Sequence, residues 1–116
     1  IAADTASYFT TDGANVVVSA PGEDAENVSR ACLISSTGIL STRRRVGTTR
    51  MSGTSMACPH VAGIVARHFQ ANPAFTLSDV RQFLALDAAR SSVAPFDSPT
   101  TTYTFDGIRE GIAQAP

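Results

Sequence analysis

A glycine-flanked turn that leads into a helix decides how the middle of the chain folds. It reads Met51-Ser52-Gly53-Thr54-Ser55-Met56-Ala57-Cys58-Pro59-His60. Beyond it, apolar side chains recur at spacings of three and four residues, which predicts a helix over 55–71. The apolar stripe of this helix comprises Ala57, Val61, Ile64, Val65, His68 and Phe69. The turn therefore places Ser55 at the first residue of a buried helix.

Ser55 admits two interpretations. As a nucleophile it is well placed, because glycine allows a tight turn and the helix N-terminus offers unpaired N–H groups and positive potential to an oxyanion. As a structural residue, Ser55 or Thr54 caps the helix. Caps are far commoner than nucleophiles, so the local physics alone favours the cap.

A catalytic serine needs a general base, because its hydroxyl is a poor nucleophile at neutral pH. The two histidines, His60 and His68, both follow Ser55 on the same predicted helix. At about 100° per residue, His60 lies roughly 140° around that helix from Ser55, and His68 lies roughly 20 Å along it. If Ser55 is catalytic, its base and the orienting acid must come from polypeptide outside these 116 residues.

A second helix is predicted over 76–90. Thr76 is suited to its N-cap, and Asp79 in the first turn favours the positive end of the helix dipole. The residues that follow this helix are rich in turn formers, and a short helical tail is expected after Gly107.

Upstream of the serine turn, the β-branched residues 16–18 predict a short buried strand that stops at Pro21-Gly22. Residues 23–51 lack a clear period and predict a long loop or insertion, with one short strand around Cys32–Ile34. The three consecutive arginines at 43–45 are interpreted first as a solvated loop face, with a processing site or an anion-binding patch as alternatives.

Length and charge limit the classes of function. The 116 residues fit one domain or part of one, and Ile1-Ala2-Ala3 resembles the middle of a strand, so we expect polypeptide upstream of it. All nine basic residues are arginine, which excludes a Schiff-base lysine and a Gly-Lys-Ser phosphate loop. With a net charge of -1 and no apolar run of about 18 residues, we expect neither a nucleic-acid nor a membrane partner.

The cysteines leave the redox compartment open. Cys32 and Cys58 either form a bridge or remain thiols. Cys58 and His60 are the only close cysteine–histidine pair, so the sequence predicts no structural metal site.

The segment from Ser52 to Gly63 resembles the active-serine signature of the subtilisin-like serine proteases, the subtilases of peptidase family S8. Residues 15–22, which end in Ala20-Pro21-Gly22, resemble the strand and turn that precede that signature. The segment after Asn72-Pro73 and residues 103–113 are similar to the family's following helix and closing segment. The resemblance thus covers most of the chain.

This resemblance implies an α/β fold, in which residues 1–116 form the C-terminal part of a three-layer catalytic domain with a parallel sheet flanked by helices. Ser55 would be the nucleophile, and its N–H and the Thr54 hydroxyl would stabilise the oxyanion. Gly53 would keep the approach open, and Ser52 would border the leaving-group side of the cleft. His60 would be a structural residue of the signature.

The function implied is that of a secreted serine endopeptidase, which hydrolyses a polypeptide substrate through an acyl-enzyme on Ser55. The catalytic Asp and His would come from an upstream segment or a separate chain, so that this chain alone is inactive. No cofactor is assigned, and calcium is a family expectation without an assigned ligand. Two alternatives stay open: a non-catalytic fragment or pseudoenzyme that acts as a scaffold, and a small binding module whose arginine-rich loop binds an anionic partner.

Overall fold

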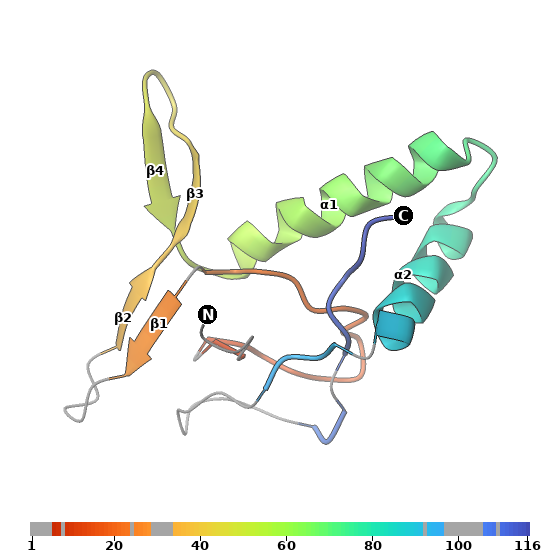
Figure 1. The fold of residues 1–116 in the computed structure, drawn as a ribbon, viewed down its shortest axis with the longest axis horizontal. Coiled ribbons are helices and arrows are strands. Elements are labelled where there is room, and N and C mark those ends of the chain that lie inside the picture. Colours follow the sequence, from red (N-terminus) through yellow and green to blue (C-terminus); the bar gives the residue numbers. More distant parts are fainter. Residues whose placement is uncertain are drawn as a thin grey trace.

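The structure is a computed structural model, and it describes residues 6–7, 9–23, 25–28, 34–91, 93–96, 106–108 and 110–116. Two short β-hairpins precede two helices (Figure 1). In chain order the elements are β1 (Ala25–Val28), β2 (Ile34–Thr37), β3 (Ile39–Thr42), β4 (Thr48–Met51), α1 (Thr54–Ala71) and α2 (Leu77–Ser91). The described residues thus combine helices and strands, which is consistent with a part of the α/β fold expected from the resemblance.

The two hairpins are separate antiparallel sheets. In the first, β1 pairs with β2 and Ala25 lies opposite Thr37; in the second, β3 pairs with β4 and Ile39 lies opposite Met51. The region 23–51, expected to be a long loop with one short strand, thus contains four. The sequence does not predict β3 and β4, because both strands are largely exposed and show no alternation of apolar and polar residues.

Helix α1 begins one residue before the expected range 55–71 and ends, as expected, at Ala71. Asn72 is its C-cap residue, and the backbone N–H of Asn72 donates to the His68 carbonyl at 3.0 Å. Pro59 lies inside the helix. Because proline has no N–H, the Ser55 carbonyl lacks the donor that normally sits four residues on. Within the described residues, neither helix is long and apolar enough to cross a membrane.

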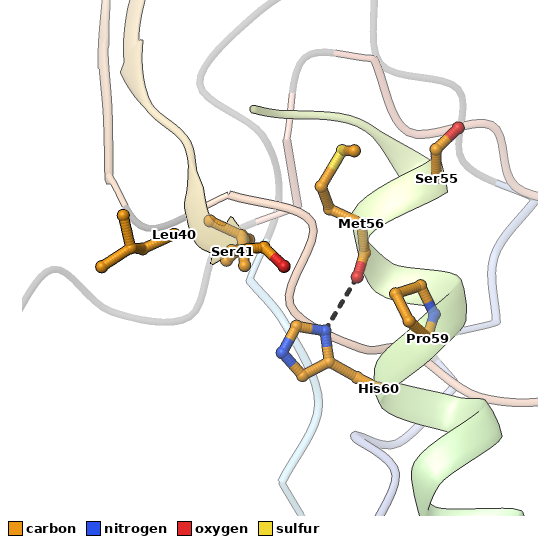
Figure 2. Close-up of a pocket in the computed structure, with 7 residues that line it drawn as sticks. Leu40, Ser41, Ser55, Met56, Pro59 and His60 are labelled. Atoms are coloured by element: carbon orange, nitrogen blue, oxygen red, sulfur yellow. Dashed lines mark hydrogen bonds between the residues drawn. The ribbon is translucent and has the colours of Figure 1, made fainter. Parts of the chain in front are cut away.

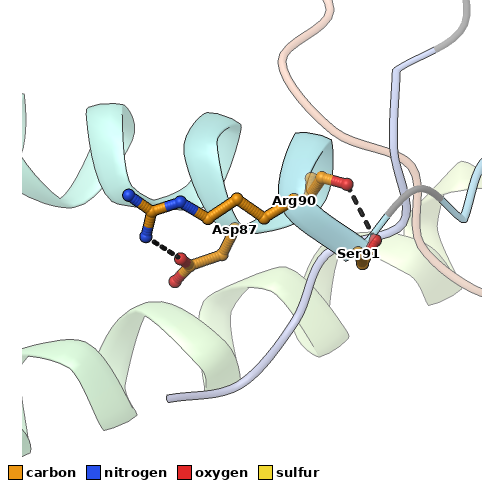
Figure 3. A network of polar contacts seen from close by, with 4 residues as sticks. Asp87, Arg90 and Ser91 are labelled. Carbon is orange, nitrogen blue, oxygen red and sulfur yellow. Dashed lines mark hydrogen bonds and ion pairs between the residues drawn. The ribbon is translucent and has the colours of Figure 1, made fainter.

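Side chains make polar contacts at both ends of helix α2. At its start the Thr76 N–H and hydroxyl donate to the Asp79 carboxylate at 2.8 and 2.7 Å, and the Asp79 N–H donates to the Thr76 hydroxyl at 3.3 Å. Together these bonds form a reciprocal capping box. The N-cap role expected for Thr76 is thereby confirmed. In the last turns Arg90 approaches Asp87 at 3.7 Å, and the Ser91 hydroxyl donates to the Ala88 carbonyl at 2.8 Å (Figure 3).

The buried core of the described residues is small and lies along α2. It comprises Ala6, His68, Val80, Leu84 and Ala88. His68 is the one buried residue of α1, and its ring stacks on Phe83 with a centroid separation of 6.3 Å. Phe75, in the connection between the helices, stacks on the same ring at 4.9 Å. The two helices are therefore joined mainly through an aromatic cluster.

The parallel sheet expected from the resemblance is reduced, in the described residues, to a single bridge between Ser19 and Ile112. Two backbone hydrogen bonds make it, from the Ser19 N–H to the Gly111 carbonyl at 3.0 Å and from the Ala113 N–H to the Ser19 carbonyl at 2.9 Å. The strand predicted at 16–18 and the helical tail predicted after Gly107 are not formed there. A β-branched run becomes a strand only where neighbouring strands pair with it. Residues 111–113 do not form a helix, because their backbone groups hydrogen-bond to Ser19 instead.

Candidate active site

Two glycines fix the backbone that enters α1. Gly53 has φ 147 and ψ 165, in a region that residues with a side chain rarely adopt. Its N–H donates to the Gly22 carbonyl at 2.9 Å, and a Cβ placed on Gly22 would come within 3.0 Å of the Gly53 oxygen. The Pro21-Gly22 turn thus supports the serine turn through a direct backbone contact.

Gly53 is also the N-cap residue of α1, and no side chain caps the helix. The capping interpretation of Ser55 and Thr54 is therefore wrong. Helical bonding begins where the Met56 N–H donates to the Gly53 carbonyl at 2.9 Å. The first turn holds no acidic side chain to offset the positive end of the helix dipole.

The four residues predicted for the site follow one another on this turn. Ser52, Thr54 and Ser55 are exposed and Gly53 is half-buried. Ser55 lies in the first turn of α1 with its hydroxyl directed away from His60 (Figure 2). An exposed hydroxyl beside backbone N–H groups at a helix N-terminus suits a nucleophile that attacks a carbonyl and stabilises the resulting oxyanion.

A pocket of about 290 Å³ lies between strand β3 and the first turns of α1 (Figure 2). Its lining comprises Ile39, Leu40 and Ser41 from β3, and Ser55, Met56, Pro59 and His60 from α1. The sequence does not predict the three β3 residues for the site, because it indicates a loop over their segment. No local pattern marks them: they reach the pocket through the hairpin register, which sets Leu40 opposite Arg50 and returns the chain to the serine turn.

Neither histidine serves as a base for Ser55. The His60 ring lies on the pocket side, and its Nδ1 donates to the Met56 carbonyl at 2.8 Å (Figure 2). His68 is 4% exposed within the helix–helix contact, where its Nε2 has no hydrogen-bond partner. Among the described residues, no histidine hydrogen-bonds to Ser55 or to a carboxylate. The described residues thus present an exposed serine hydroxyl at a helix N-terminus, with no histidine hydrogen-bonded to it.

Metal ligands do not gather in the described part of the chain, which brings together no group of three or more His, Cys, Asp or Glu side chains. No calcium ligand set is assigned within it. Cys58 is an exposed free thiol on α1, and Cys32 lies outside the described residues.

Comparisons with known proteins match this chain to subtilisin-like proteins. The family model described as the subtilase family matches residues 1–107. A subtilisin-like protease of Coccidioides posadasii is 45% identical over 65 residues, which is 54% of this chain and 13% of that protein. The proprotein convertase subtilisin/kexin type 9 of Rattus norvegicus is 38% identical over 84 residues, or 72% of this chain and 10% of that protein. No solved structure gives a significant match. The chain thus spans a small part of the length of these relatives.

Proposed function

The chain belongs to the subtilase family, and from this premise we propose that it supplies the serine nucleophile of a peptidase that hydrolyses peptide bonds. The observation that carries the proposal is that the Ser55 side chain is exposed and does not cap the helix. Ser55 lies at the N-terminus of α1, and the capping role that would otherwise explain it falls to Gly53.

In the proposed reaction the Ser55 oxygen attacks the carbonyl carbon of the scissile peptide bond. The negative charge that forms on the carbonyl oxygen is stabilised by the Ser55 N–H and the Thr54 hydroxyl, assisted by the helix dipole. Gly53, without a side chain, leaves room for the substrate backbone, and Ser52 borders the side from which the amine leaves. Collapse of this intermediate expels the amine and leaves an acyl-enzyme on Ser55, which water then hydrolyses.

We propose that the general base and its orienting acid are a histidine and an aspartate of an upstream segment or a separate chain. His60 is engaged with the Met56 carbonyl and His68 is buried, so neither can take the Ser55 proton. The 116-residue chain alone is then inactive. For the completed enzyme we propose a polypeptide substrate and a secreted location, as the family membership suggests.

The test is peptide hydrolysis by the assembled protease, which contains this chain together with the segment that carries the aspartate and the histidine. Ser55→Ala should lower kcat by about 10³-fold or more, with little change in KM. Ser78→Ala, which removes an exposed hydroxyl from α2, is the matched control and should leave kcat unchanged. Hydrolysis that survives in Ser55→Ala would contradict the proposal. A wild-type assembly that binds peptide but never cleaves it would indicate a pseudoenzyme.

A further inference from the structure

The three arginines at 43–45, here called the arginine run, lie in the turn that joins β3 to β4. The turn is closed by a hydrogen bond from the Arg43 N–H to the Gly47 carbonyl at 3.0 Å. All three arginines are exposed, and none forms an ion pair with a described residue. Figure 1 shows the base of this hairpin beside the start of α1 and its turn projecting away from both helices. The run is therefore a cluster of positive charge held at a projecting tip.

Acidic side chains are absent from the sequence around this tip. Residues 27–78 contain six arginines and no aspartate or glutamate, although the whole chain has ten acidic residues. This interval includes the β3–β4 hairpin and all of α1. The other arginine of the hairpin, Arg50, is engaged, because its Nη1 donates to the Gly38 carbonyl at 2.8 Å. The positive potential of the tip is thus not offset by neighbours in the sequence.

The tip and the pocket beside Ser55 share one strand. Ser41 lines the pocket, and the run begins two residues further along the chain. Because a chain spans at most about 3.3–3.6 Å per residue, the run lies no more than roughly 14 Å from Ser41. An extended peptide covers that distance in about four residues. A peptide that is seated in the pocket and extends along β3 towards the tip would therefore reach the run.

We propose that the arginine run selects polypeptide substrates that carry acidic residues a few positions from the residue seated in the pocket. The proposal rests on the proposed peptidase function and names a feature of its substrate. Leu40, Met56 and Pro59 give the pocket an apolar lining for one substrate residue, and the run provides the charge complement for a nearby acidic cluster. A nucleic acid fits less well, because residues 39–51 contain no aromatic side chain on which a base would stack.

The experiment compares matched peptides with the assembled protease, by kcat/KM and by fluorescence anisotropy of labelled peptide. One peptide carries three glutamates beginning three residues before the scissile bond, a second carries them beginning three residues after it, and a third has glutamines at both places. The variant R43Q/R44Q/R45Q removes the run. The control R67Q/R81Q/R90Q removes the same charge from exposed positions on the two helices.

We expect one glutamate peptide to be preferred over the glutamine peptide by about tenfold at low salt, in both kcat/KM and affinity. The preference should shrink at 0.5 M NaCl, where the Debye length is only about 4 Å. It should vanish in R43Q/R44Q/R45Q and persist in R67Q/R81Q/R90Q, while turnover of the glutamine peptide stays the same in all three proteins.

Equal kcat/KM and equal affinity for the three peptides would overturn the inference, as would a preference that survives in R43Q/R44Q/R45Q. Anisotropy separates this failure from failure of the proposed function. An assembly that cleaves nothing, yet binds the glutamate peptide through the run, would refute the peptidase and retain the inference. Tighter binding of single-stranded DNA than of any peptide, dependent on the run, would overturn the substrate role and assign the tip to nucleic acid.

Discussion

At the scale of single residues, position 53 of the candidate site requires a glycine because of its backbone conformation. Its φ of 147 is open to glycine and strained for other residues. The same residue accepts the first helical hydrogen bond from Met56 and donates to Gly22. Its backbone conformation thus sets where α1 begins, and with it the position of Ser55.

Gly53→Ala should therefore disturb both stability and reactivity. Backbone strain should lower the free energy of unfolding by about 1–3 kcal/mol, and the displaced turn should slow reaction of Ser55 with a fluorophosphonate in the assembled protease. Chemical denaturation and labelling rates measure the two effects.

Gly13→Ala is the matched control for this prediction. Gly13 has φ 157, and a Cβ added to it would meet no atom within 4 Å, so the substitution brings the backbone strain without touching the site. It should lose similar stability and label at the wild-type rate. If Gly53→Ala also labelled at the wild-type rate, the turn would not be what positions Ser55.

At the scale of elements, the capping box of α2 gives a pH dependence with a definite sign. Hydrogen bonds from the Thr76 hydroxyl, and next from its backbone N–H, hold the pKa of Asp79 below its ordinary value of 3.8. A carboxyl whose pKa is lower in the folded state stabilises that state above the unfolded pKa. This contribution is lost as the pH falls below 3.8 and through the folded pKa.

Thr76→Ala should remove the hydroxyl donor, so the pKa of Asp79 should rise towards 3.8, and α2 should lose about 1 kcal/mol of stability. NMR titration of the Asp79 carboxyl and thermal melts measure the two effects. Arg90→Ala is the control, because Arg90 is 73% exposed in its pair with Asp87 and should matter little. An unchanged Asp79 pKa in Thr76→Ala would contradict the assigned cause.

The elements also show what the sequence could predict. Both helices follow from local signals. For α1 the signal is an apolar period after Ser55, and for α2 it is a threonine just before the helix with an aspartate three residues on, in its first turn. The hairpins do not, because strands such as Thr48–Met51 are exposed and carry no alternation. The pocket depends on those strands, so the sequence does not predict its β3 lining. The position of Ser55 at a helix start favours a cap on local physics alone, and only the resemblance of residues 52–63 to the subtilase signature marks it as a nucleophile.

At the scale of the whole molecule, the chain exposes more surface than its mass predicts. Its accessible area is 8082 Å², against about 6000 Å² for a folded monomer of 12.1 kDa. Helix α1 buries only His68 among its 18 residues, and a side chain added at Gly63 would meet no atom within 4 Å. We therefore expect the open apolar face of α1 to pack against further polypeptide in the proposed assembled protease.

The isolated 116-residue chain should therefore fold poorly. We expect it to bind a hydrophobic dye such as ANS and to melt without a cooperative transition, because its small core leaves apolar surface in water. The assembled protease is the control and should melt cooperatively with little dye binding. A monomeric chain with a sharp, cooperative melt would show that it needs no further polypeptide.

The most direct test of the central claim, that Ser55 is a peptidase nucleophile, is mass spectrometry of the assembled protease after reaction with a fluorophosphonate. This reagent modifies activated serines and leaves ordinary ones untouched. We expect a single adduct that maps to Ser55 and is lost in Ser55→Ala. An unlabelled chain in an otherwise folded assembly, or an adduct on another serine, would contradict the claim.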